Sequence, residues 1–279
     1  MNAPLNARAL LLWSAGALAV ALVTTNPVYR ALVILAGADL LVAHRRPGRS
    51  LAGYGRVMAF GAAMAVILNL LLSHAGDHPF AGLPDWLPGI GGPWTVESVV
   101  YGLDAALGLS AAMLAVAPLA TILDPHDLVD ALPARLERTG IALAAALNLI
   151  PGIGRSFQEV REAQTMRGWR PTGLRAWSDI LVPVALTSIE GSMELAEAME
   201  ARAFGSGSRT RYAPVPWQRR DAAIAAGAAL AIAIVVVARL AGGAADWYPY
   251  PVVTLPPIEP AMILACLALS VPAWPGTSA

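Results

Sequence analysis

Long apolar runs alternate with short polar connections along most of the chain. A helix needs about 20 mostly apolar residues to cross a bilayer, and several runs approach or reach this length. They occupy residues 9–23, 28–44, 57–74, 96–123, 221–240 and 258–271. The first run is slightly short and the last is the weakest. This pattern predicts an all-α, polytopic helical membrane protein with about six transmembrane helices.

The polar and breaker residues divide this pattern into three parts. Asn26-Pro27 marks a turn, and residues 77–94 form a connection rich in proline and glycine. The apolar pattern is then interrupted by residues 124–220, which are charged and helical in period. We therefore expect N-terminal transmembrane helices in 1–123, a polar insertion in 124–220 and C-terminal transmembrane helices in 221–279.

The insertion is too long for an idle connection, and its charge content suggests that it is too polar to cross the bilayer. Asp124 and Pro125 resemble the start of a helix. Two further helices are expected at roughly 155–167 and 187–203. Between them, residues 170–186 are half apolar, which predicts an interfacial or re-entrant element.

Arginine is distributed unevenly among the connections. Residues 24–27, 75–95 and 242–257 contain none, whereas 44–56 contain four and 124–220 contain twelve. Because basic residues are enriched in cytoplasmic loops, we expect both termini and the insertion to be cytoplasmic, in a multi-pass protein of the cell membrane. Such alternation argues against the other interpretation of the apolar runs, as core helices of a soluble protein. The first run lacks a small-residue cleavage site, so we expect a retained span.

Composition excludes several kinds of site. Hydrophobic residues make up 57% of the chain and charged residues only 14%, compared with about a quarter charged in soluble domains. The formal net charge is zero, so nothing indicates a nucleic-acid partner. All 19 basic residues are arginine, which excludes a P-loop and a lysine Schiff base. The single cysteine, Cys266, excludes an internal disulfide and a cysteine metal cluster.

One charged template occurs twice in the insertion, in EVREAQTMRGW (159–169) and ELAEAMEARAF (194–204). Each copy has two glutamates three residues apart, an arginine five residues later, a small residue and an aromatic ring. The matched pairs are Glu159 and Glu194, Glu162 and Glu197, Met166 and Ala201, Arg167 and Arg202, Gly168 and Ala203, and Trp169 and Phe204. An arginine in the last turn suits the negative helix end, and Gly168 suits the left-handed position that terminates a helix.

The repeat allows two interpretations. An arginine near a helix end followed by glycine is common capping, and glutamate–arginine pairs can simply solvate a helix face. The alternative is a rigid tip whose guanidinium and ring fit an acidic, apolar groove on another protein. Two copies with one spacing favour the second interpretation.

The segments AQTMRGW and AEAMEARAFGSGSRTRY resemble the paired Ala-Arg-Gly motifs of the T component of energy-coupling factor (ECF) transporters, the CbiQ-like or EcfT-like family. TTNPVYRALVILA and NLIPGIGRSFQEVREAQ extend this resemblance, which covers most of residues 20–240. It implies a non-catalytic subunit, without a cofactor, of an ATP-driven vitamin or metal-ion importer. In that family, two coupling helices dock on two ATP-binding-cassette (ABC) ATPase subunits and transmit their motion to a membrane-embedded substrate-binding S subunit.

By position, the resemblance assigns ATPase docking to the ends of both helices, with the four glutamates supporting. The docking residues are Met166, Arg167, Gly168, Trp169, Ala201, Arg202, Ala203 and Phe204. Ala203 departs from the motif by replacing glycine. We therefore expect the second helix to continue to Gly205, lengthening its tip by up to one turn.

Other polar residues leave alternatives open. His74, Asp77 and His78 have a metal-like spacing, but Gly76 and Pro79 argue against a helix, so no metal site is predicted. Charges at membrane depth are costly and often functional. Asp39 and Asp104, both in apolar runs, either pair with arginines or mark where an S subunit packs. Arg209 and Arg211 suit phospholipid head groups or the acidic rim of a partner.

Two other classes of protein compete with the coupling subunit. A stand-alone secondary transporter predicts matched halves with broken helices, and the halves of this sequence do not match. An intramembrane enzyme requires a catalytic set at membrane depth, and none is evident from the sequence.

Overall fold

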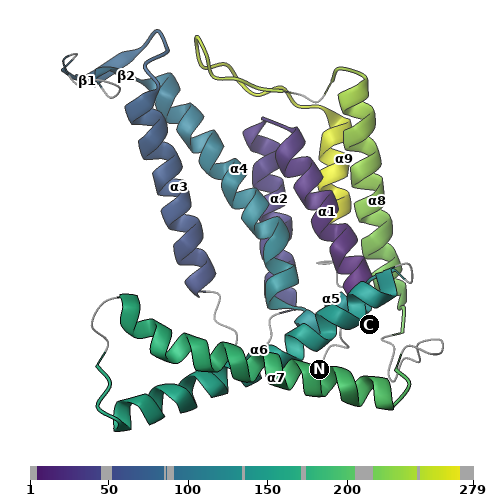
Figure 1. The fold of residues 1–279 in the computed structure, drawn as a ribbon. Helices are drawn as coiled ribbons and strands as arrows, with labels where there is room; N and C mark the ends of the chain where they lie inside the picture. Colours follow the sequence, from purple (N-terminus) through teal and green to yellow (C-terminus); the bar gives the residue numbers. More distant parts are fainter. Residues whose placement is uncertain are drawn as a thin grey trace. The chain divides into compact units, whose positions relative to one another are not determined.

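The computed structural model describes residues 5–44, 52–84, 86, 91–133, 136–170, 174–204, 216–243 and 246–270. These residues form two compact units (Figure 1). Unit 1 comprises Met1–Asp124 and Val215–Ala279, and unit 2 comprises Pro125–Pro214. The two units are described separately.

The apolar runs predicted from the sequence all form helices in unit 1, which confirms the all-α fold class. These helices are α1 (Ala7–Val23), α2 (Pro27–Ala43), α3 (Ala52–Leu72), α4 (Val96–Thr121), α8 (Arg219–Leu240) and α9 (Pro260–Leu269). Local chemistry explains where they begin. The side chain of Asn26 accepts a hydrogen bond from Val28 N, and Pro27 occupies the first turn of α2, where its missing N–H costs nothing.

Small residues allow the helices of unit 1 to pack closely. A Cβ atom on Gly16 of α1 would lie 3.2 Å from Ala228 O on α8, and one on Gly37 of α2 would lie 3.0 Å from Leu114 O on α4. In a bilayer the hydrophobic effect does not drive helices together, so the van der Waals contacts made at such short distances stabilise their packing instead. Trp13 of α1 is fully buried, and its indole donates a 2.8 Å hydrogen bond to Leu269 O of α9.

A buried ion pair joins α2 to α4. Arg30 Nη1 lies 2.6 Å from Asp104 Oδ2, and the side chains are only 13% and 7% exposed. The same nitrogen donates a 3.0 Å hydrogen bond to Asp104 O. Gly108, one turn further along α4, makes room for the guanidinium, because its Cβ would lie 3.0 Å from Arg30 Cζ. Of the two alternatives for Asp104, pairing with an arginine is therefore the one present in the structure; Asp39 is exposed.

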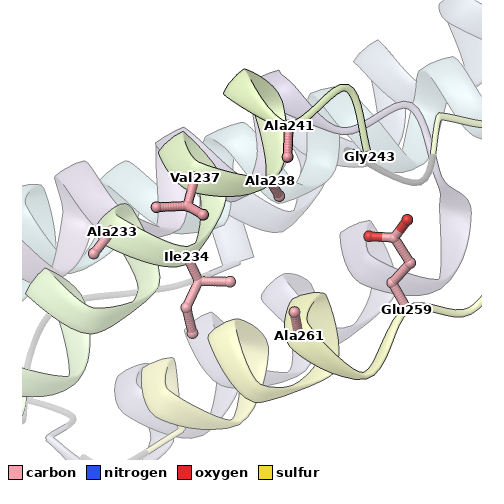
Figure 2. A pocket seen from close by; sticks show the side chains of 8 residues that line it. All are labelled: Ala233, Ile234, Val237, Ala238, Ala241, Gly243, Glu259 and Ala261. Carbon is pink, nitrogen blue, oxygen red and sulfur yellow. The ribbon is translucent and has the colours of Figure 1, made fainter.

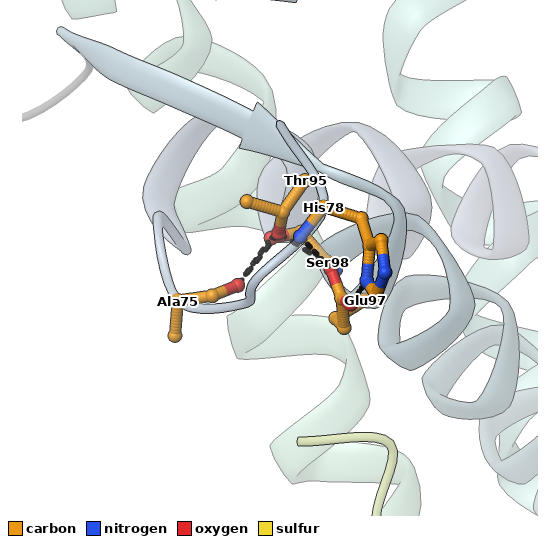
Figure 3. Close-up of polar contacts among 5 residues, drawn as sticks. All are labelled: Ala75, His78, Thr95, Glu97 and Ser98. Atoms are coloured by element: carbon orange, nitrogen blue, oxygen red, sulfur yellow. Dashed lines mark hydrogen bonds and ion pairs between the residues drawn. The ribbon is translucent and has the colours of Figure 1, made fainter. Parts of the chain in front are cut away.

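The 73–98 connection is more ordered than its composition predicts. Residues 77–94 were expected to be a loop, but they contain strands β1 (Pro79–Leu83) and β2 (Gly92–Thr95), which pair antiparallel. The expectation was wrong because tertiary contacts fix both ends of the hairpin. Thr95 caps α4 by accepting from Ser98 N at 3.2 Å, and its hydroxyl donates to Ala75 O at 2.6 Å (Figure 3).

His78 and Glu97 close the base of this hairpin. His78 Nδ1 lies 2.6 Å from Glu97 Oε1, and the Glu97 side chain is fully buried (Figure 3). A side chain on Gly76 would overlap the other carboxylate oxygen, so the turn requires glycine there. His78 is thus engaged in an ion pair. The described residues contain no cluster of three or more metal-binding side chains.

The 246–259 connection ties together the helix ends beside the hairpin. Trp247 N donates a 2.9 Å hydrogen bond to Thr25 Oγ1, and Asn26 Nδ2 donates a 2.7 Å bond to Pro257 O. The Tyr250 hydroxyl lies 2.7 Å from Ser73 Oγ, at the end of α3. An apolar groove of about 410 Å³ lies between α8 and α9, with Glu259 at one end (Figure 2).

Unit 2 contains α5 (Pro125–Asp130), α6 (Glu137–Met166), the 3-10 helix η2 (Leu174–Trp177) and α7 (Ser178–Ala201). The helices expected at 155–167 and 187–203 are therefore the C-terminal parts of longer helices. The described part of 170–186, where an interfacial or re-entrant element is predicted, contains η2 and the start of α7, which begins at Ser178 and continues through Pro183. Its position relative to the membrane stays a prediction.

Four described helices are long and apolar enough to cross a membrane, namely α3, α4, α8 and Thr139–Met166 of α6. The α1 and α9 helices are apolar but shorter. By length and composition alone, Thr139–Met166 could cross a membrane, although 124–220 is expected to be too polar to do so. The cytoplasmic position of 124–220 stays a prediction. After Glu137 and Arg138, the N-terminal half of α6 is apolar, and the other charged residues of the helix lie in its C-terminal half.

Removal of one partner of the Arg30–Asp104 pair should destabilise unit 1. We expect Asp104→Leu alone to lower the free energy of unfolding in detergent by about 3–5 kcal/mol, because it leaves a buried guanidinium without its counterion. Arg30→Met combined with Asp104→Leu should restore most of the loss, since both charges are gone. Losses that simply add in the double variant would contradict this account of the pair.

The hairpin should loosen as the pH rises. The hydrogen bond to Glu97, followed by the charges of Glu97 and Asp77, raises the pKa of His78 above its ordinary value of 6.5. Protonated His78 therefore stabilises the folded hairpin fully below pH 6.5, and this contribution is lost as the pH rises through the raised pKa. Hydrogen exchange of β1 and β2 amides, corrected for intrinsic rates, should accelerate across that range. The same profile in His78→Gln would refute the assignment.

Candidate functional site

The repeated template forms the C-terminal ends of α6 and α7, and both ends have the same backbone geometry. Arg167 and Arg202 are the residues that follow the last helical residue of each helix. In the first end, Gly168 N donates to Thr165 O at 3.0 Å and Trp169 N to Gln164 O at 2.9 Å. These two bonds define a Schellman motif, which satisfies carbonyl groups that the helix leaves free.

The second end repeats this motif with an alanine in the glycine position. Ala203 N donates to Glu200 O at 2.9 Å, and Phe204 N donates to Met199 O at 3.0 Å. Ala203 has φ of +53°, and Gly168 has φ of +83°. The left-handed conformation predicted for Gly168 is thus confirmed. The predicted extension of the second helix to Gly205 is wrong, because the hydrogen bonds of the motif hold alanine in a conformation that usually favours glycine.

Both arginines are exposed on unit 2, as are all four template glutamates, Glu159, Glu162, Glu194 and Glu197. Met166 is 83% exposed and Phe204 56% exposed. The helices α6 and α7 cross, and their C-terminal ends lie far apart within the unit (Figure 1). Unit 2 therefore presents two separate tips, each with a guanidinium at its end.

Trp169 differs from the other template residues because it folds back on unit 2. Its Nε1 donates a 3.1 Å hydrogen bond to Ala176 O, and its ring meets Trp177 edge-on with centroids 6.2 Å apart. Trp177 also stacks on Phe157 of α6, with centroids 6.3 Å apart. In addition, Gln164 Nε2 donates to Asp179 O at 3.3 Å. The end of α6 is thereby fixed to the start of α7.

Sequence reasoning missed Phe157 and Trp177, whose rings complete this aromatic cluster. The available signal was weak. Trp177 lies in a segment that was expected to be interfacial, and nothing in the spacing of Phe157 and Trp169 indicates a shared partner. Only the direction in which the chain turns after Gly168 brings the three rings together.

Comparison with known proteins identifies a family and several relatives. The family model of CbiQ, a cobalt transport protein, matches residues 3–212. The chain is 28% identical over 246 residues to the energy-coupling factor transporter transmembrane protein EcfT of Bacillus selenitireducens, covering 79% of this chain and 86% of that protein. It is 34% identical over 121 residues to the corresponding protein BioN of Rhizobium etli, covering 39% and 55%. Over 149 residues it is 25% identical to EcfT of Lactobacillus helveticus, covering 46% and 54%.

The strained position at the second tip can be tested by substitution. Ala203→Gly should stabilise the last turn of α7 by about 1 kcal/mol, because glycine has no Cβ to oppose the left-handed conformation. Hydrogen exchange of the amides at 199–204 should slow accordingly.

The matched control is Gly168→Ala at the first tip. No neighbouring atom lies within 4 Å of a Cβ added there, so the added strain comes from the backbone alone. We expect faster exchange at 164–169. Faster exchange at the second tip in Ala203→Gly would show that the left-handed alanine is not the source of strain.

Proposed function

The chain belongs to the CbiQ family of cobalt transport proteins, and from that premise we propose that it couples ATP hydrolysis to import through the two tips of unit 2. The resemblance drawn from the paired motifs is confirmed: the chain is a transmembrane component of an ECF transporter. The proposal adds the partners. They are two ABC-type ATPase subunits, one for each tip, and a membrane-embedded S subunit that binds a vitamin or a metal ion.

The observation that carries this proposal is the identical termination of α6 and α7. The two hydrogen bonds alone are common capping, since Gly242 and Gly243 make the same pair at the end of α8. What only α6 and α7 share among these three ends is an arginine at the first non-helical position. Each motif holds its arginine at the first non-helical position with the side chain exposed. Two equal tips suit a partner that has two related docking grooves, as a pair of ATPase subunits does.

Arginine suits this contact on chemical grounds. Its planar guanidinium makes two parallel hydrogen bonds to a carboxylate, which fixes orientation as well as position. A tip held by a Schellman motif loses little conformational freedom when it binds. We therefore infer that an acidic groove on each ATPase subunit receives Arg167 or Arg202, and that closure of the ATPases moves α6 and α7.

The distribution of arginine supports a cytoplasmic position for unit 2. Residues 124–220 contain twelve of the 19 basic residues, and basic residues are enriched on the cytoplasmic side of membrane proteins. Although Thr139–Met166 is apolar enough for a span, Arg155, Glu159, Arg161 and Glu162 occupy its second half. We propose that this half lies in the cytoplasm with both termini, and that Arg209 and Arg211 meet phospholipid head groups.

Unit 1 suits a mechanical role without a catalytic site of its own. Its ionisable side chains at helix depth include Arg30 and Asp104, which pair with each other. The many exposed apolar side chains on α3 and α8 suit contact with lipid or with the helices of an S subunit. We propose that α2 and α4, joined by the ion pair, move as one body when unit 2 is displaced.

Removal of the tip arginines should uncouple the complex. We expect Arg167→Ala and Arg202→Ala each to weaken binding of the ATPase subunits by about 2–5 kcal/mol, because each leaves a partner carboxylate buried without its counterion. The double variant should abolish substrate uptake while leaving the protein in the membrane. The measurements are co-purification with the ATPases and uptake by whole cells.

A matched control is available on α6. Arg155→Ala and Arg161→Ala remove exposed arginines of α6 that lie away from the tip, and uptake should remain near that of the unchanged protein. Full uptake after removal of both tip arginines, or uptake that persists without any ATPase, would favour a stand-alone transporter.

A further inference from the structure

The two tips share a backbone geometry but differ in where their aromatic ring lies. We propose, on the basis of the function above, that only the second tip docks through its ring. Phe204 enters an apolar pocket beside the carboxylate that receives Arg202. Trp169 instead remains on unit 2 as a positioning residue for Arg167, whose docking contact is mainly ionic.

At the first tip, the indole already has partners. Trp169 is half-buried, its N–H is satisfied by Ala176 O at 3.1 Å, and its ring lies against Trp177. Insertion into a partner would require this bond and the ring contact to break. Insertion would give up both contacts before any new one is made, so the indole stays where it is. The exposed apolar group beside Arg167 is the flexible side chain of Met166.

At the second tip, the arrangement is reversed. Phe204 is 56% exposed, and the residue that precedes Arg202 is the small Ala201. Among the ring contacts between described residues, none involves Phe204. Its backbone N–H is nevertheless fixed by the bond to Met199 O, so the ring projects from a rigid point. An exposed aromatic ring with few rotatable bonds, next to an arginine, is the composition that dominates binding energy at protein interfaces.

This difference predicts unequal chemistry at the two grooves. The groove for the first tip needs a carboxylate and a surface that tolerates methionine. The groove for the second tip needs a carboxylate next to an apolar pocket large enough for a phenyl ring. Binding through the first tip should therefore weaken more steeply with salt, because charges dominate it. Binding through the second should depend more on burial of apolar surface.

The test isolates each tip in the full-length, detergent-solubilised chain. In the Arg167→Ala background only the second tip can dock, and in the Arg202→Ala background only the first. Binding of the ABC ATPase subunits of the same transporter is then measured in each background. Phe204→Ala should weaken binding through the second tip about 10- to 30-fold, and Phe204→Leu should restore part of it. Neither variant should change hydrogen exchange in α7.

Trp169 provides the matched comparison at the equivalent position. Trp169→Ala should accelerate hydrogen exchange across 164–179, and any weaker docking of the first tip should appear together with this loosening. Trp169→Phe retains a ring but loses the bond to Ala176 O, so its rate of hydrogen exchange should lie between those of Trp169→Ala and the unchanged chain. Weaker binding in Trp169→Ala without faster exchange would make Trp169 a direct contact and overturn the proposal.

The outcomes separate this inference from the function on which it rests. If Arg202→Ala loses binding while Phe204→Ala binds as well as the unchanged chain, the ring is not a docking group and the inference fails alone. If neither arginine matters for ATPase binding, the proposed function fails first.

Discussion

The main-chain carbonyl groups at the C-terminal end of a helix need hydrogen-bond partners, and the candidate site depends on how two helices meet this need. At Gly168 and Ala203 the chain reverses into the left-handed conformation, and the N–H groups of that residue and of the next one donate to the free carbonyls. This places each arginine at the outermost point of its helix. If the helix end frayed over several residues, the guanidinium would lie on a flexible segment, and that segment would lose more conformational entropy on binding.

Unit 1 meets a related constraint in a different setting. Lipid offers no partner to a polar group; accordingly, several helices of unit 1 begin with side-chain caps, and its buried Arg30 and Asp104 pair with each other. Asn26 caps α2, Thr95 caps α4, and Arg30 lies beside Asp104 in the space left by Gly108. Glycine thus serves two purposes in the chain. At Gly168 and Gly242 it permits a reversal at a helix end, whereas at Gly108 it admits a neighbouring side chain.

Features encoded by neighbouring residues could be predicted from the sequence. The apolar runs, the turn at Asn26-Pro27 and the conformation of Gly168 follow from local preferences. Features that depend on distant partners could not. The hairpin at 79–95 needs Glu97 and His78 to meet, and Trp169 turns inward only because Trp177 and Ala176 lie beside it. The long N-terminal parts of α6 and α7 were obscured by Pro151 and Pro183, which the packed helices accommodate. The docking role of the tips remains a proposal.

The left-handed alanine has a consequence for how related chains are found. Ala203 and Gly168 have different side chains but make equivalent turns, so a consensus written in residue letters splits one structural feature into a match and a mismatch. Both helix ends are described by a positive φ at the residue after the arginine, together with two hydrogen bonds that return to carbonyls of the last helical turn. Homologues whose second motif lacks glycine can therefore retain the same helix end. Comparison of their backbone torsion angles would reveal a relationship that comparison of residue identities misses.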